Sequence, residues 1–212
     1  MKRFLWIVGL TVVIAGVAVA QHDCPGCPRA AAERSRGNEE PAAPALSSEW
    51  QDPAGAEPGV KLLPEWTVAS ITGTGDEAAA VSSLYRVIRW MSAQALPMVG
   101  RPFVVWYDEP GQVVPESLRY MVGVPIPDRV GGAAEEGIVV KPWGGFRVAA
   151  AGHVGPRDRL DAVRVRIREW TEAGGWEIAG SAAEFFFDLP GQVPDDSLRV
   201  EVAYPVREAG SR

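Results

Sequence analysis

The sequence has little cysteine and little histidine, with two residues of each among 212. Cys24 and Cys27 form a Cys-Pro-Gly-Cys segment with only His22 nearby, whereas a structural zinc site needs four ligands. We therefore predict no metal site and no cofactor. The two cysteines are interpreted as a small local disulfide in an oxidising compartment, or as an unused pair. No Ser-His-Asp arrangement, metal-spaced cluster or phosphate-binding loop is visible in the sequence.

An excess of positive charge is missing as well. Lys and Arg together number 21 and Asp and Glu number 27, which gives a net charge of −6. An acidic chain has no positive field that would hold a phosphate backbone, so we predict that nucleic acid is not a partner. The hydrophobic share of 47% and the charged share of 23% are typical of a globular protein.

The N-terminal segment predicts export. Lys2 and Arg3 precede an uncharged apolar run, residues 4–20, that ends in Ala-Val-Ala. Small residues at the two alanine positions suit signal peptidase, with cleavage before Gln21. A run of this length is also at the lower limit for spanning a bilayer, so residues 1–20 are either a cleaved signal peptide or a retained N-terminal anchor. Both alternatives predict a periplasmic or extracellular protein, in the second case tethered to the membrane.

The next segment, residues 21–61, is rich in Ala, Glu, Pro, Gly and Ser. Its apolar residues are isolated and show no period, so the segment cannot bury enough surface to offset its ordering entropy. We interpret it as a disordered linker that leads to a folded domain over residues 62–208.

An internal repeat with an offset of 80 residues runs through this domain. The longest match pairs residues 108–113 (DEPGQV) with residues 188–193 (DLPGQV), and Ser-Leu-Arg recurs at 117–119 and 197–199. Trp90 also matches Trp170, and the alignment needs no gap. The repeat predicts two copies of one supersecondary unit, modules 62–130 and 138–208, related by a pseudo-twofold axis.

Each module is predicted to contain strand, helix, strand and strand in that order. The helices are recognised by apolar residues at helical spacing, with Asp76 as a possible N-cap of the first, and Pro-Gly turns end the middle strands. The sequence therefore predicts an α+β fold with an antiparallel sheet and two main helices. The expected elements are strands 66–71 and 146–151, helices 76–95 and 157–173, strands 103–108 and 184–188, and strands 118–124 and 198–204.

The last strand of each module alternates between two faces. Leu198, Val200, Val202 and Tyr204 are expected on one face, and Glu201 on the other with its two neighbours. In the first module the position of Glu201 is occupied by Met121. We interpret this asymmetry between two otherwise similar modules as a place where a symmetric scaffold becomes a specific site.

The motifs of residues 62–208 resemble the GyrI-like small-molecule-binding domain, which is also the effector-binding half of some AraC-type and MerR-type regulators. The resemblance is carried by His153-Val-Gly-Pro followed by Leu160, by residues 184–188 before a proline, by residues 194–198, and by the closing Glu201-Val-Ala-Tyr-Pro. It implies a duplicated fold with a ligand cleft between the modules and a glutamate on the last strand, matched by Glu201, in that cleft. The SOUL haem-binding family shares this fold, but His153 falls in a turn and is interpreted as structural.

The chain departs from the family pattern at two points. Arg157 stands where the family often has an aromatic residue, and a Phe-Phe-Phe run at 185–187 stands where it often has tyrosine. Some family members hydrolyse strained toxins with a glutamate and a tyrosine, a role that Tyr120 or Tyr204 would have to fill here. An export segment replaces the DNA-binding helix-turn-helix of the regulators, which argues against a transcription factor.

These observations lead to a binding hypothesis with two alternatives. The protein is predicted to hold a small, lipophilic or cationic molecule between its modules, outside the cytoplasm. The first alternative is a hydrolase that uses Glu201 and a tyrosine, and the second is an envelope protein-interaction module with an exposed apolar patch. Residues repeated in both modules, such as Arg119 and Arg199 with Asp108 and Asp188, are interpreted as scaffold. The predicted ligand-binding residues are Glu201, Tyr120, Met121, Trp106, Phe186 and Tyr204.

Overall fold

The computed structural model describes residues 57–128 and 137–210. The predicted signal or anchor, Cys24, Cys27 and the predicted linker as far as residue 56 lie outside the described residues. Within the described ranges, none of the helices is long and apolar enough to cross a membrane.

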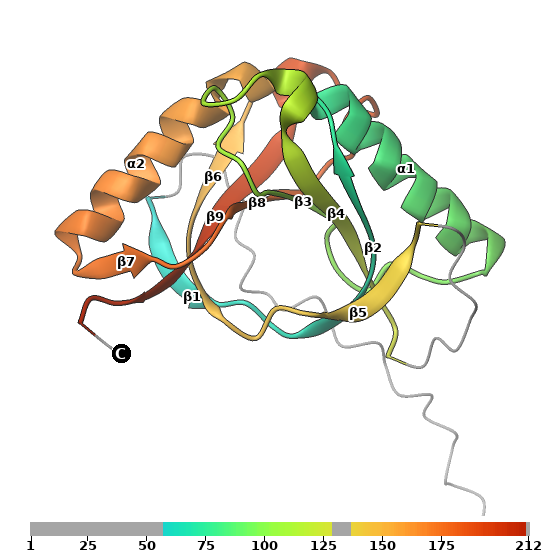
Figure 1. The fold of residues 1–212 in the computed structure, drawn as a ribbon, viewed down its shortest axis with the longest axis horizontal. Coiled ribbons are helices and arrows are strands. Elements are labelled where there is room, and N and C mark those ends of the chain that lie inside the picture. Colours follow the sequence, from blue (N-terminus) through green and yellow to red (C-terminus); the bar gives the residue numbers. More distant parts are fainter. Residues whose placement is uncertain (1–56, 129–136, 211–212) are drawn as a thin grey trace, which may run out of the picture. The chain divides into compact units, whose positions relative to one another are not determined.

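One antiparallel sheet organises the described part of the chain (Figure 1). Its strands follow the order β1-β6-β9-β8-β3-β4-β2-β5, and β7 pairs with β9 beside this path. The strands are β1 (Gly59–Leu62), β2 (Trp66–Thr74), β3 (Phe103–Trp106), β4 (Arg119–Ile126), β5 (Val139–Trp143), β6 (Arg147–Val154), β7 (Trp176–Ile178), β8 (Ala182–Phe186) and β9 (Arg199–Glu208). The helices are α1 (Glu77–Ala93) and α2 (Leu160–Ala173), with short 3-10 turns η1 (Pro115–Ser117), η2 (Arg157–Arg159) and η3 (Asp195–Ser197).

The predicted order of elements is confirmed in both halves. The second half repeats the sequence β2, α1, β3, η1, β4 of the first half as β6, α2, β8, η3, β9, at an offset close to 80 residues. At the centre of the molecule β3 pairs with β8, and Val104 lies opposite Glu184. These two residues are also each other's counterparts in the repeat, which is the register expected where two copies meet about a twofold axis.

Helix α1 begins as the sequence predicts, whereas α2 begins later. The Asp76 side chain accepts a hydrogen bond from the Ala79 amide at 2.9 Å and so satisfies one of the free donors of the first turn. The second helix begins at Leu160 rather than at 157, because the three residues after Pro156 form the 3-10 turn η2.

Three strands were not predicted. Strand β1 lies within the segment interpreted as linker, and β5 and β7 lie between the predicted elements. All three are short, and β1 and β5 occupy the two ends of the sheet path. Such strands are held by backbone hydrogen bonds on one side, so their sequences need no strict alternation of apolar and polar residues.

The sheet has two differently covered faces. Both helices pack on one face, and the sheet curls so that β1 and β5 approach each other on the opposite side (Figure 1). There Leu63 and the turn between β5 and β6 exchange backbone hydrogen bonds, from Gly145 N to Leu63 O at 3.0 Å and from Leu63 N to Phe146 O at 2.9 Å. The interior side is filled by aromatic rings, with Phe103 stacked on Trp143 at a centroid distance of 4.2 Å. Every strand residue therefore faces either the helices or this interior.

The residues interpreted as scaffold form matching ion pairs in the two halves. The backbone amide and guanidinium of Arg119 donate to Asp108, and those of Arg199 donate to Asp188 in the same way. The Arg119 guanidinium lowers the pKa of Asp108 to about 2. This pairing confirms the interpretation of both pairs as parts of the shared fold.

Two further predictions concern single residues. The expected contact of Trp90 with Trp170 at the module junction is wrong, because both lie near the C-terminal ends of helices that point away from each other (Figure 1). His153 has the structural role expected of it, since its Nε2 lies 3.0 Å from the carbonyl oxygen of Pro156 within the same turn.

Candidate functional site

The six predicted ligand-binding residues lie on two opposite faces of the sheet. Trp106, Tyr120, Phe186 and Tyr204 belong to the core under the helices, whereas Met121 belongs to the interior core. Glu201 pairs with Phe185 across the β8–β9 ladder and so faces the same interior as Met121. The structure therefore does not bring Glu201 together with the four aromatic side chains in one cleft.

Glu201 is paired within the interior. Its Oε1 lies 2.5 Å from Lys61 Nζ, and its side chain is 13% exposed. The other oxygen, Oε2, is buried and has no hydrogen-bond partner among the described residues. Burial raises the pKa of Glu201 above its usual range, and Lys61 partly opposes this rise.

This raised pKa predicts a pH dependence of stability. A carboxyl group with a higher pKa in the folded state binds protons more readily there, so the folded state loses stability as pH rises from the ordinary value of 4.5 through the raised pKa. Wild type should therefore become less stable relative to Glu201→Gln as pH rises over this interval. Urea unfolding of both proteins at several pH values between 4 and 7 measures the difference, and a difference that stays constant or grows in favour of wild type contradicts the assignment.

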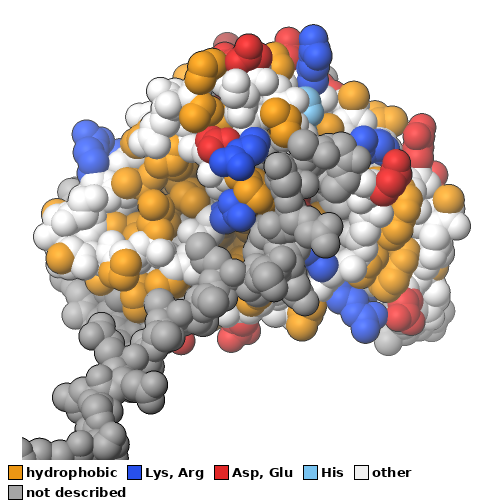
Figure 2. Space-filling model, turned by 180° about the vertical axis from the view of Figure 1, so that it is seen from behind, with side chains coloured by type: hydrophobic (Ala, Val, Ile, Leu, Met, Phe, Trp, Pro, Cys, Tyr) orange, Lys and Arg blue, Asp and Glu red, His pale blue; other side chains and the backbone are white. Residues whose placement is uncertain are grey.

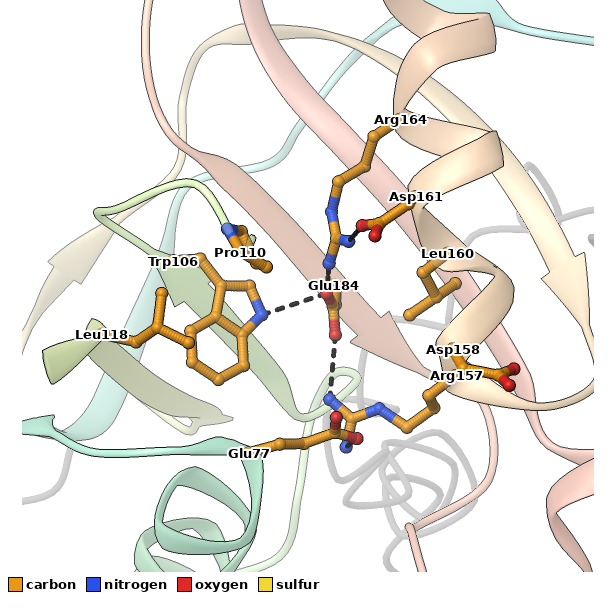
Figure 3. A pocket seen from close by; sticks show the side chains of 10 residues that line it. All are labelled: Glu77, Trp106, Pro110, Leu118, Arg157, Asp158, Leu160, Asp161, Arg164 and Glu184. Carbon is orange, nitrogen blue, oxygen red and sulfur yellow. Dashed lines mark hydrogen bonds and ion pairs between the residues drawn. The ribbon is translucent and has the colours of Figure 1, made fainter. Parts of the chain in front are cut away.

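The most deeply buried charge of the described chain lies under the helices, at Glu184 in the middle of β8. The residue is 1% exposed. Its Oε1 accepts hydrogen bonds from Trp106 Nε1 at 3.0 Å and from Arg164 Nη2, and its Oε2 accepts one from Arg157 Nη2 at 3.1 Å (Figure 3). Two arginines and one indole therefore compensate a carboxylate that water does not reach.

The two arginines reach Glu184 from α2 and from the turn before it. Arg164 projects from the buried side of α2 and also pairs with Asp161 at 2.5 Å. Arg157 comes from η2 and extends to the first turn of α1, where its Nη1 lies 2.5 Å from Glu77 Oε1. The cluster thus connects the N-terminal ends of both helices to the centre of the sheet, at the junction of the two modules (Figure 3).

This polar cluster is confined to the second half of the repeat. The counterpart of Glu184 is Val104 and that of Arg164 is Leu84, so the first half has apolar residues at these buried positions. Removing charges from water costs several kcal/mol per ion, and apolar residues of similar volume often serve stability equally well or better. The first half shows that the fold does not need these charges, which makes the cluster a candidate for function.

A pocket opens above this cluster. It has a volume of about 170 Å³ and is lined by Glu184, Arg157, Arg164 and Trp106 together with residues of both modules (Figure 3). A cavity of roughly 150 Å³ holds a molecule the size of benzene. The pocket therefore accommodates a small group rather than a whole drug-sized molecule.

A second, more open pocket lies on the other side of Trp106. It has a volume of about 490 Å³, within the range of small-molecule sites, and Tyr204 lines it with Arg168. The Tyr204 hydroxyl accepts a hydrogen bond from Arg168 Nη2 at 3.2 Å and donates one to Glu109 Oε1 at 3.4 Å. Burial raises the pKa of this hydroxyl, an effect that Arg168 partly opposes. Because Trp106 lines both pockets, the two adjoin at this side chain.

The sequence contained two signals for Glu184 that were not used. A carboxylate within Ala-Ala-Glu-Phe-Phe is unusual for a buried strand, and it faces Val104 in the same offset comparison that singled out Met121 and Glu201. Arg164 likewise interrupts an apolar helix stripe between Leu160 and Ile167.

The pair of groups expected for the hydrolase alternative is not assembled by the described residues. Glu201 faces the interior, while Tyr120 and Tyr204 lie under the helices. The Tyr120 hydroxyl forms a buried hydrogen bond with Ser83 at 2.9 Å, and that of Tyr204 is held by Arg168. Within residues 57–128 and 137–210, no group of three or more His, Cys, Asp and Glu is placed to hold a metal ion.

The exposed large hydrophobic side chains are spread over several elements. They include Leu62 on β1, Tyr107 after β3, Val139 on β5 and Val165 on α2. Seen from behind, hydrophobic areas lie on either side of a group of basic and acidic side chains (Figure 2). The exposed apolar patch required by the interaction-module alternative stays a prediction.

The comparison with known families identifies the domain. The GyrI-like small molecule binding domain matches residues 56–207, which is most of the chain, so the protein belongs to the GyrI-like family. No curated protein sequence matches the chain.

Solved structures share the fold at low sequence identity. The EcmrR C-terminal domain has a TM-score of 0.59 and 18% identity, covering 72% of this chain and 98% of that domain. EcmrR in its DNA complex has a TM-score of 0.63 and 16% identity over 72% of this chain, which spans only 58% of the EcmrR chain. A hydrolase from Listeria innocua has a TM-score of 0.57 and 14% identity, covering 71% of this chain and 92% of that one. At such identities the likeness concerns the fold.

Proposed function

We propose that this GyrI-like domain binds a small lipophilic cation in the pocket above Glu184, outside the cytoplasm. The observation that carries the proposal is the position of Glu184: a fully buried carboxylate at the base of a pocket, where the other half of the molecule has Val104. Membership of a small-molecule-binding family supports binding as the general activity.

The surroundings of Glu184 favour a ligand with a positive, partly apolar head. The carboxylate supplies negative charge, and Trp106, Phe186 and Leu118 supply apolar surface beside it. A carboxylate next to aromatic faces attracts cations through both charge and ring quadrupole. The open pocket beyond Trp106 offers space for a larger body attached to such a head.

The proposed location outside the cytoplasm rests on the sequence of residues 1–20. A basic start, an apolar run and an Ala-Val-Ala end are the features of an export signal or an N-terminal anchor. Cell fractionation of the full chain tests this part, with the protein expected in the periplasmic, membrane or secreted fraction and not in the cytoplasm.

A heavy-atom probe tests where the ligand binds. Crystals of the full chain are soaked with millimolar 4-bromobenzamidinium, a planar cation of benzene size, and the bromine is located by its anomalous signal. The expected peak lies in the pocket lined by Glu184, Trp106 and Phe186. A peak in the interior beside Glu201, or no ordered peak at all, contradicts the proposed site.

A further inference from the structure

Arg157 holds a position that distinguishes it from the other charges of the cluster. Its guanidinium lies 3.1 Å from Glu184 Oε2, 2.5 Å from Glu77 Oε1 and 5.3 Å from the ring centroid of Phe186. Two carboxylates and an aromatic face around one planar cation are the contacts by which a protein recognises a cationic ligand. The chain itself supplies the cation in this case.

Arg157 is also less firmly fixed than Arg164. It projects from the three-residue turn η2, which follows Gly155 with a φ of +128°, a backbone conformation that strongly favours glycine. One of its partners, Glu77, is 53% exposed, and its own Nε is buried with no hydrogen-bond partner among the described residues. Arg164, by contrast, projects from the body of α2. A movement of the short turn is therefore enough to withdraw Arg157 while Arg164 stays in place.

The charges that remain when Arg157 is withdrawn favour a cation in its place. Glu184, Glu77 and Asp161 then face a single positive group, Arg164, in the pocket. The site would hold an excess of negative charge beside the Phe186 ring until another cation entered. A small lipophilic cation satisfies this requirement, whereas an anion of the same size does not.

From these contacts we infer that Arg157 is a tethered occupant of the cation site, which a cationic ligand must displace. The inference rests on the proposed function for its ligand class, and it adds two consequences. Arg157 lowers the affinity of the site for every free cation, and it restricts binding to ligands that can replace a guanidinium at both Glu184 and Glu77.

A rescue experiment tests the tethered occupant without any assumption about the natural ligand. Arg157→Ala leaves a space of guanidinium size between Glu184 and Glu77, so millimolar methylguanidinium should raise the melting temperature of this variant of the full chain in a saturable way. Wild type and Arg159→Ala, a change at an exposed arginine in the same turn, should not respond. Sodium chloride at the same ionic strength is the salt control. If Arg157→Ala folds poorly, methylguanidinium should restore its folding, and a failure to stabilise or restore it overturns the inference.

A titration connects the tethered occupant to the proposed function. Benzamidinium should bind Arg157→Ala about tenfold or more tightly than wild type, since tenfold is a modest gain for the loss of a competing ion pair. Arg159→Ala should bind as wild type does, and benzoate should not gain affinity. Equal or weaker binding of benzamidinium to Arg157→Ala, or benzoate binding that wild type has and this variant lacks, overturns the inference and makes Arg157 an anion ligand. If methylguanidinium rescues the variant but benzamidinium binds neither protein, the proposed ligand class fails while the tethered occupant stands.

Discussion

Glu184→Val alone should lower the free energy of unfolding by about 3–5 kcal/mol, whereas Glu184→Val combined with Arg164→Leu should restore most of that loss. The single change leaves the Arg164 guanidinium buried without its central partner. The double change replaces both charges by the residues that the first module has at the same positions, Val104 and Leu84. Apolar replacement of a buried ion pair is often neutral or stabilising.

Urea unfolding of wild type, the single variant and the double variant, followed by circular dichroism, measures this effect. Arg157 keeps its ion pair with Glu77 in both variants, so its charge does not become unpaired. Leu84→Ala in the first module is a matched control for the loss of packing at the helix–sheet contact and should cost about 2–5 kcal/mol. A double variant that is as unstable as the single variant would show that the charged cluster is required by the fold, and the argument for a functional role would lose its basis.

The general architecture of the domain was predictable because the sequence repeats itself. The offset of 80 residues located each strand and helix twice, and the Pro-Gly turns fixed the ends of the middle strands. The N-cap at Asp76 and the pairing of Arg119 with Asp108 followed from local sequence rules and are confirmed. The strands β1, β5 and β7 escaped prediction because short edge strands depend on partners distant in the sequence rather than on their own pattern.

The site was less predictable because side-chain direction and strand pairing both matter. Alternation along β9 already placed Glu201 and Tyr204 on opposite faces, and the structure confirms that placement. The register of β8 against β9, which puts Phe186 opposite Val200, is a tertiary property and decided that Phe186 lies under the helices. The set of six residues therefore joined two faces that the sheet separates.

Comparison of the two halves remains the most useful sequence signal, but burial has to select among the differences. Met121 against Glu201 and Val104 against Glu184 are equally visible in the sequence. Only the structure shows that Glu184 is fully buried at the junction with three hydrogen-bond donors, while Glu201 pairs with Lys61 from a strand that the sequence did not reveal.

Loss of cation binding is the second large effect that we expect. The Glu184→Val and Arg164→Leu double variant should bind benzamidinium about 10- to 100-fold more weakly than wild type. A hydrogen bond to a charged group contributes roughly 1.5–3 kcal/mol, and 1.4 kcal/mol corresponds to a tenfold change in affinity. The variant removes one negative and one positive charge, so its net charge is unchanged and a general electrostatic effect cannot account for the loss.

Calorimetric titration of full-length wild type and the double variant with benzamidinium is the most direct test of a ligand site at Glu184. Benzamide, the neutral molecule of the same shape, serves as the control for apolar binding, and both proteins are shown to be folded before titration. The account predicts that wild type binds benzamidinium more tightly than benzamide and that the double variant loses this preference. Equal benzamidinium affinities in the two folded proteins would contradict the account.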